Sequence, residues 1–230
     1  MINSDVTLQS GETLLKAFIS RPEGDEKRPG LVVIHEIVGL SDHIKDITRR
    51  LAGEGYAALA LDLFSAGNTA ICIWKCLAAV RTGQTDHFAV HYLQSALDYL
   101  AAQSWVDSQR LGAIGFCMGG NFAISLACQD KRVKTIAPFY SLTPGKADFS
   151  NMCPVVGSYP EQDLTRKAGL ELDTALSACN VPHDIKVYPG ARHCFLNESI
   201  PFLYNDDAAK DSWKRTMQFF DQYLVSPRSE

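Results

Sequence analysis

Cys117 is the residue in this sequence whose neighbours point most directly to catalysis. It is the central residue of Gly115-Phe-Cys-Met-Gly119, and Gly-x-nucleophile-x-Gly is typical of a sharp turn between a strand and a helix. Flanking side chains larger than hydrogen would collide with that strand and helix, and Gly120 loosens the contact further. We expect the helix that follows to direct its positive end at the sulfur and to favour the thiolate. Gly-rich turns of this kind also occur in folds that bind phosphate, so the partners of Cys117 must decide.

Asp163 and His193 could complete a catalytic triad with Cys117. A thiol nucleophile needs a base, and the base needs a third group that fixes its tautomer. Both residues follow predicted strands, and the order nucleophile, acid, histidine is the order found in α/β-hydrolases. Glu161 is a rival for the acid, whereas His183 precedes its strand and would lie at the wrong end of the sheet.

Acyl transfer also requires donors for the negative charge that develops on the carbonyl oxygen. The backbone N–H of Met118, directly after the nucleophile, is the first candidate, and that of Ile37, in the turn after an early strand, is the second. Glu36 is unexpected beside such a site because a carboxylate opposes negative charge. Its alternative role is that of a carboxylate near the start of a helix, where the helix dipole stabilises it.

These side chains require a sheet whose strand ends meet at one edge. Residues 6–9 and 13–20 have the alternation of an antiparallel hairpin, and the rest of the chain alternates between buried strands and helices. This alternation predicts right-handed crossovers and a three-layer α/β/α fold with a mostly parallel central sheet. The expected strands are 31–35, 56–62, 111–116, 133–140, 154–158 and 184–188, and the expected helices are 42–53, 71–80, 88–103, 122–128, 166–179 and 212–224.

The segment between residues 63 and 87 is less regular than the rest of the chain. It follows the carboxyl end of a predicted parallel strand, where sheets of this kind bind ligands. We therefore expect it to form a pocket wall or lid, with Trp74 on a short helix as a candidate substrate contact.

Composition excludes several classes of function. A single domain is expected over residues 1–230, because no Pro-, Gly- or Ser-rich linker divides the chain. The net charge of -4 offers no basic surface for nucleic acid or an anionic membrane. The chain has no signal-peptide pattern, so a cytoplasmic location is expected. A monomer is also expected. Seven cysteines, an odd number, favour reduced thiols, and Cys72 and Cys76 lack a second pair at zinc-site spacing. With no nucleotide, flavin or metal motif, no cofactor is expected.

Four segments together resemble the dienelactone hydrolase (carboxymethylenebutenolidase) family. They are the elbow at 115–120, His35-Glu36 with Gly39 close behind, the 157–163 segment and Ala191-Arg-His-Cys-Phe195. The resemblance extends from about Leu31 to the closing helix. It implies an α/β-hydrolase that opens enol-lactones, with Cys117 as nucleophile, His193 as base and Asp163 as orienting acid. It also implies that Glu36 exchanges a proton with the thiol and lets the thiolate form when substrate is bound.

One departure from the family concerns the substrate carboxylate. Family members that open the bacterial dienelactone hold its carboxylate with two arginines. Arg81 could supply the first, but Asn197 stands where the second is expected, and Arg192 is a possible replacement. The expected small-molecule substrate is therefore a lactone or an activated ester, with or without a carboxylate.

Two other functions stay open at this point. A non-enzymatic small-molecule binder or thiol sensor on the same fold is suggested by the seven cysteines and the altered carboxylate site. A general carboxylesterase or peptidase would differ from the lactone hydrolase only in substrate.

Overall fold

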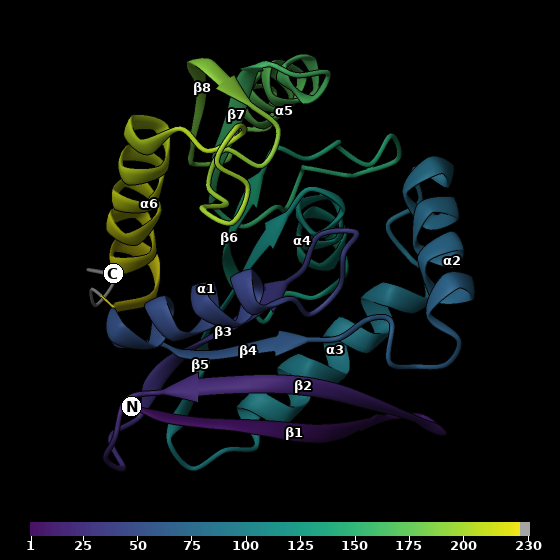
Figure 1. The fold of residues 1–230 in the computed structure, drawn as a ribbon, viewed down its shortest axis with the longest axis vertical. Coiled ribbons are helices and arrows are strands. Elements are labelled where there is room, and N and C mark those ends of the chain that lie inside the picture. The colour runs from purple at the N-terminus through teal and green to yellow at the C-terminus, as the bar shows by residue number, and fades with distance from the viewer. Residues whose placement is uncertain (226–230) are drawn as a thin grey trace.

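The computed structural model describes residues 1–225. Their strands form one eight-stranded mixed sheet (Figure 1). The strand order is β1-β2-β4-β3-β5-β6-β7-β8, and every neighbouring pair is parallel except β1–β2 and β2–β4. The strands are β1 (Ile2–Ser10), β2 (Thr13–Arg21), β3 (Arg28–Ile34), β4 (Ala57–Leu61), β5 (Val106–Phe116), β6 (Val133–Phe139), β7 (Val155–Gln162) and β8 (His183–Arg192). The predicted α/β fold with a mostly parallel sheet is confirmed.

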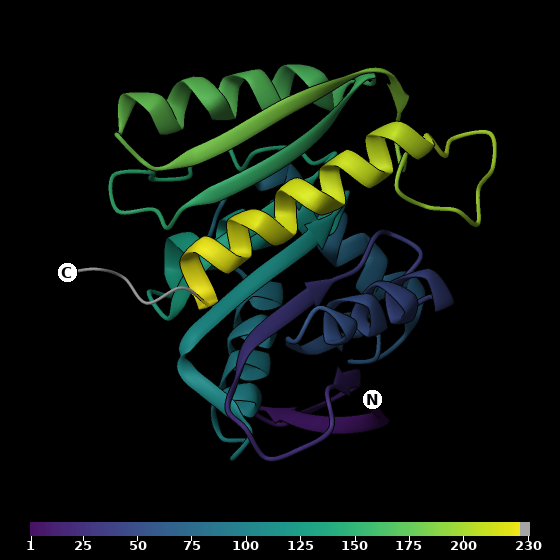
Figure 2. The same cartoon turned by 90° about the vertical axis from the view of Figure 1, so that its left-hand side faces the viewer.

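Helices cover both faces of this sheet (Figure 2). One core lies between the sheet and helices α1 and α6, and the other lies between the sheet and helices α2, α3, α4 and α5. The helices are α1 (Asp42–Gly53), α2 (Thr69–Thr82), α3 (Phe88–Ala101), α4 (Met118–Gln129), α5 (Thr165–Ala178) and α6 (Asp206–Phe220), with a π-helical turn at Asp221–Val225. This arrangement gives the three layers expected from the sequence.

The central strands are apolar on both faces because helices cover each side. Leu31, Val32, Val33 and Ile34 of β3 are all fully buried. Helix α1 begins after Ser41, whose side chain accepts a hydrogen bond from the backbone of Ile44. Because the central strands run parallel, their carboxyl ends lie at one edge of the sheet, where the candidate catalytic residues are found.

Several boundaries differ from those expected, and three of them have a clear local cause. Helix α6 begins six residues earlier than the predicted 212, because the Asn205 side chain caps it by accepting from the Ala208 backbone N–H at 3.0 Å. Strands β7 and β8 run on to Gln162 and Arg192, which pair with each other. A register shift between Pro160 and Gln162 lets the two strands continue past the proline and glycine that suggested a loop.

The helix expected at 71–80 is α2, and it is longer than predicted. Asn68 caps its start by accepting from the backbone N–H groups of Ala70 and Ile71, and Gly83 ends it with a left-handed φ of 65°. Among the helices of residues 1–225, none has the length and apolar character that crossing a membrane would require.

Candidate active site

Cys117 lies on a strained turn between β5 and α4. Its φ of 55° is unusual for a side chain with a Cβ. A Cβ on Gly115 would overlap the carbonyl of Gly119, and one on Gly119 would overlap the carbonyl of Ile34 in β3. Glycine is therefore needed at both positions, as the elbow pattern predicted, and the turn holds Cys117 at the start of helix α4.

His193 and Asp163 form a hydrogen-bonded pair close to Cys117. His193 Nδ1 lies 3.0 Å from Asp163 Oδ2, and the other carboxylate oxygen accepts from the Thr165 backbone N–H at 2.7 Å. Because Nδ1 donates to the carboxylate, Nε2 is left free to accept a proton. Cys117 and His193 line the same cavity.

The rival residues are engaged elsewhere. The Glu161 carboxylate accepts from the Gly190 backbone N–H at 2.9 Å. His183 contacts the Val181 carbonyl and the Ser177 hydroxyl at the start of β8. The geometry favours Asp163 over Glu161 as the partner of His193.

The Cys117 thiol is protonated at neutral pH. Burial raises its pKa to about 11, and the carboxylates of Glu36 and Asp163 raise it as well, whereas a hydrogen bond from the Met118 backbone N–H lowers it. The expected contribution of the helix start is present, because the Met118 backbone N–H favours the thiolate, but it does not decide the net shift of the pKa. Desolvation and two nearby carboxylates outweigh the field of the helix.

Glu36 lies at the centre of a buried group of polar side chains. It is 4% exposed, accepts a hydrogen bond from the Tyr140 hydroxyl at 3.2 Å and contacts the Cys194 thiol. Burial and the Glu36 charge raise the pKa values of both Tyr140 and Cys194, so both stay protonated as donors. Sequence reasoning missed Tyr140 and Cys194. The available signals were that Cys194 directly follows His193 and that Tyr140 ends the expected strand 133–140.

His35 fixes the turn that carries Glu36 and Ile37. Its Nε2 accepts from the Leu63 backbone N–H at 3.1 Å, so Nδ1 carries the proton and donates to the Glu36 carbonyl at 2.6 Å. Burial lowers the pKa of His35 and keeps the ring neutral. The backbone of this turn also packs closely against Gly119 of the elbow. The Ile37 and Met118 amides, the two expected oxyanion donors, therefore belong to segments in mutual contact.

A cavity of about 170 Å³ lies beside Cys117. Helix α2, the elbow, the segment after β6 and the start of α5 supply its walls, which are mostly apolar. Its lining residues are Leu77, Val80, Cys117, Met118, Asn121, Tyr140, Leu142, Leu164, Thr165 and His193. Within residues 1–225, no three His, Cys, Asp or Glu side chains are grouped as a metal ion would require.

The structure places the other predicted substrate contacts outside this cavity. Arg81 is an exposed residue near the end of α2 and is not part of the cavity lining. Arg192 is exposed at the end of β8 and its Nε donates to Gln162 at 3.3 Å. Asn197 is 5% exposed, and its side chain accepts from the Ser199 backbone N–H, which stabilises the turn after His193. A substrate-binding role for these residues stays a prediction.

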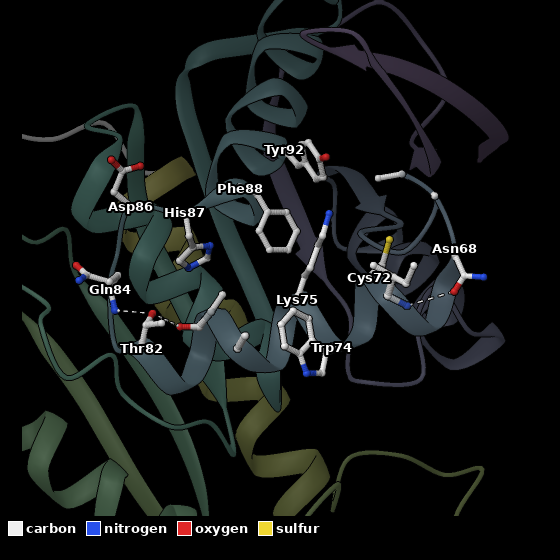
Figure 3. A pocket seen from close by; sticks show the side chains of 15 residues that line it. Asn68, Cys72, Trp74, Lys75, Thr82, Gln84, Asp86, His87, Phe88 and Tyr92 are labelled. Atoms are coloured by element: carbon white, nitrogen blue, oxygen red, sulfur yellow. Dashed lines mark hydrogen bonds between the residues drawn. The ribbon is translucent and has the colours of Figure 1, made fainter.

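Trp74 lines a different and larger pocket, shown in Figure 3. This groove has a volume of about 600 Å³ and lies between α2 and the start of α3. Trp74 is 69% exposed there, with Lys75, Phe88 and Tyr92 around the same groove. His87 also lines it, and burial lowers the pKa of that ring to about 4. The structure does not bring Trp74 to the cavity of Cys117.

Comparison with known proteins agrees with this architecture. The sequence model of the dienelactone hydrolase family matches residues 15–224. A protein of Saccharolobus solfataricus named "Putative carboxymethylenebutenolidase" is 31% identical, over 95% of this chain and 98% of its own length.

Solved structures with a similar fold also carry dienelactone hydrolase names. The crystal structure of a "Putative Dienelactone Hydrolase" from Klebsiella pneumoniae superimposes with a TM-score of 0.85 at 28% identity, covering 96% of this chain and 99% of its own. A metagenomic protein described as a dienelactone hydrolase-like promiscuous phosphotriesterase gives a TM-score of 0.84 at 27% identity, covering 97% of this chain and 98% of its own. With its α/β-hydrolase architecture and a family match over residues 15–224, this chain belongs to the dienelactone hydrolase family.

Proposed function

We propose that this protein hydrolyses lactones or activated carboxylic esters through a triad of Cys117, His193 and Asp163. The observation that carries the proposal is the 3.0 Å contact between His193 Nδ1 and Asp163 Oδ2 at a cavity that Cys117 also lines. That contact orients the imidazole with Nε2 available as a base, which is the arrangement that nucleophilic acyl transfer needs. Membership of the dienelactone hydrolase family supports the same reaction class.

The first half of the reaction forms a thioester. The Cys117 proton passes to Glu36, the sulfur adds to the substrate carbonyl carbon, and the oxyanion is held by the Met118 and Ile37 backbone N–H groups. Collapse of this intermediate breaks the bond to the enolate or alkoxide, which takes up the proton held by Glu36. For a lactone, the leaving oxygen stays attached to the same molecule.

The second half releases the acid. His193 Nε2 removes a proton from water, and the resulting hydroxide adds to the thioester carbonyl. The carbon–sulfur bond then breaks, the Cys117 sulfur regains a proton from His193, and the carboxylic acid product leaves. Asp163 stabilises the imidazolium that forms between these two steps.

Glu36 is assigned the first proton transfer because the resting thiol is not ionised. The burial that raises the pKa of Cys117 to about 11 leaves very little thiolate at neutral pH. The Glu36 carboxylate interacts electrostatically with the thiol and can accept its proton as substrate arrives. Tyr140 and Cys194 hold that carboxylate by hydrogen bonds. The same pKa counts against a thiol sensor, since oxidation of cysteine proceeds through the thiolate.

The proposal is tested by steady-state hydrolysis of p-nitrophenyl acetate and a simple enol-lactone, with the native protein and Cys117→Ala. We expect Cys117-dependent turnover of at least one compound and a loss of roughly a thousandfold or more in the variant. Cys72→Ala, which removes a buried thiol from the groove beside α2, is the matched control and should keep native rates. Equal turnover by native protein and Cys117→Ala would remove the proposed mechanism.

A further inference from the structure

Three exposed leucines surround the cavity beside Cys117. Leu77 of α2, Leu142 after β6 and Leu164 before α5 are 46%, 42% and 76% exposed, and all three line that cavity. They come from segments far apart in the sequence, so their meeting at one site is not a consequence of one apolar helix face. Exposed apolar side chains gathered around a concave site mark a surface that binds apolar groups.

Two carboxylates act on the sulfur of Cys117 at this cavity. The carboxylates of Glu36 and Asp163 both raise the pKa of Cys117, which shows that their field reaches the reacting sulfur. No lysine or arginine is among the lining residues that the described part of the chain supplies. An anionic group entering this cavity would lose its hydration without gaining a cationic partner.

The volume indicates the size of the group that the cavity can hold. An apolar cavity of about 150 Å³ in another protein holds one benzene molecule. By that comparison the 170 Å³ beside Cys117 accepts about six or seven non-hydrogen atoms.

We propose that the substrate presents an uncharged, apolar group of about this size to the leucine-lined cavity, and that a carboxylate in that position is selected against. The inference rests on the proposed function and specifies its substrate class, which is a neutral lactone or ester with a short alkyl or small ring group. It also assigns Leu77, Leu142 and Leu164 as residues that determine specificity.

A pair of esters that differ in charge but not in shape tests this proposal. The p-nitrophenyl ester of 4-methylpentanoic acid and the mono-p-nitrophenyl ester of succinic acid share one leaving group, and an isopropyl group in one replaces a carboxylate in the other. We expect kcat/KM to favour the neutral ester by roughly tenfold or more. Equal or faster turnover of the succinate ester, lost in Cys117→Ala, would overturn the inference and leave the proposed function standing. The spontaneous rate is subtracted from each measurement, because the succinate carboxylate attacks its own ester and releases p-nitrophenolate without the enzyme. Enzymatic turnover that survives Cys117→Ala would remove the proposed function and the inference with it. No turnover of either ester by a protein that hydrolyses p-nitrophenyl acetate would overturn the inference alone.

Three variants test the roles of the cavity wall and of Arg81 separately. Leu142→Lys places a cation on the exposed rim and should reduce the preference for the neutral ester several-fold, whereas Leu142→Met should keep it. Arg81→Gln should leave the ratio of the two kcat/KM values unchanged, because Arg81 does not line the cavity. A selective loss of succinate turnover in Arg81→Gln would show that Arg81 binds the carboxylate and would contradict the proposal.

Discussion

Helix α2 separates two pockets that differ in size and in chemistry. Its residues Leu77 and Val80 face a cavity of about 170 Å³ that contains Cys117 and His193, whereas Trp74 and Lys75 face a groove of about 600 Å³. The groove also holds a cysteine and a histidine, but its Cys72 is buried in the core and burial keeps its His87 neutral. The smaller pocket has Cys117 at a helix start and His193 bound to a carboxylate. The position of reacting groups, and not volume, identifies the candidate site.

The largest difference between the two pockets should appear when each histidine is replaced. His193→Gln removes the base and should lower kcat/KM for p-nitrophenyl acetate by roughly a thousandfold or more. His87→Gln in the groove should stay within about twofold of the native value, because the ring lies outside the proposed reaction path. Comparable losses in both variants would contradict the assignment of the reaction to the smaller pocket.

The next effect concerns the two acidic residues near the end of β7. Asp163→Asn keeps the shape but no longer stabilises the imidazolium, so kcat should fall by roughly a hundredfold to ten-thousandfold. Glu161→Gln serves as the matched control, since the Glu161 carboxylate accepts a hydrogen bond from the Gly190 backbone N–H, and it should retain most activity. A larger loss in Glu161→Gln would reverse the assignment of the acid.

A smaller effect concerns the reactivity of the thiol as a function of pH. Because the pKa of Cys117 is raised to about 11, its alkylation by iodoacetamide should be slow at neutral pH and should accelerate as the pH rises toward that value. Glu36→Gln removes one repelling charge, which lowers the pKa and should raise the rate at pH 8 by about threefold to tenfold. The rate is followed by mass spectrometry of the peptide that contains Cys117. A profile that stays in place or moves to higher pH in Glu36→Gln would contradict this electrostatic account.

The smallest effect is expected in the groove. Trp74→Ala removes a 69% exposed side chain that lies outside the cavity of Cys117, so kcat/KM for p-nitrophenyl acetate should change by less than about twofold. Leu77→Ala on the other face of the same helix should change KM for the 4-methylpentanoate ester more than that. A tenfold loss of kcat/KM in Trp74→Ala would mean that the groove takes part in substrate binding.

The parts of the site that lie at strand ends could be predicted from the sequence. Parallel strands carry their following loops to one edge of the sheet, so the spacing of Cys117, Asp163 and His193 along the chain was enough to predict that they meet. The glycines of the elbow were equally informative, because a Cβ at Gly115 or Gly119 would overlap backbone atoms. The topology explains why Asp163 and His193 lie close together, because they follow the neighbouring strands β7 and β8.

Helix α2 shows what the sequence could not provide. Apolar residues lie on several faces of this helix: Cys76 faces the core, Leu77 faces the cavity and Trp74 faces the groove. Helical periodicity therefore gave no indication of which face would meet the substrate. The direction of Trp74 and Arg81 was set by the packing of α2 against α4, which only the three-dimensional structure reveals.

The protonation state of Cys117 could not be predicted from the sequence, for a related reason. The helix start was visible in the chain, but the burial of the sulfur and the convergence of Glu36 and Asp163 on it were not. Glu36 precedes the nucleophile by about eighty residues in the chain, and Tyr140 and Cys194, which hold it, come from two further segments. Burial of Cys117 by segments distant in the sequence decided that its pKa is raised and not lowered.

The most direct test of the central claim is to look for the covalent intermediate on Cys117. Native protein and Cys117→Ala are mixed with excess p-nitrophenyl acetate, quenched in acid within the first turnovers, and measured by intact mass and peptide mapping. The account predicts one added acetyl group on the peptide that contains Cys117, a burst of p-nitrophenolate in the native protein, and neither in the variant. His193→Gln should retain the acetyl group longer than the native protein, because the base that activates water is missing. Hydrolysis by the native protein with an acetyl group on another residue, or with the same burst in Cys117→Ala, would contradict the account.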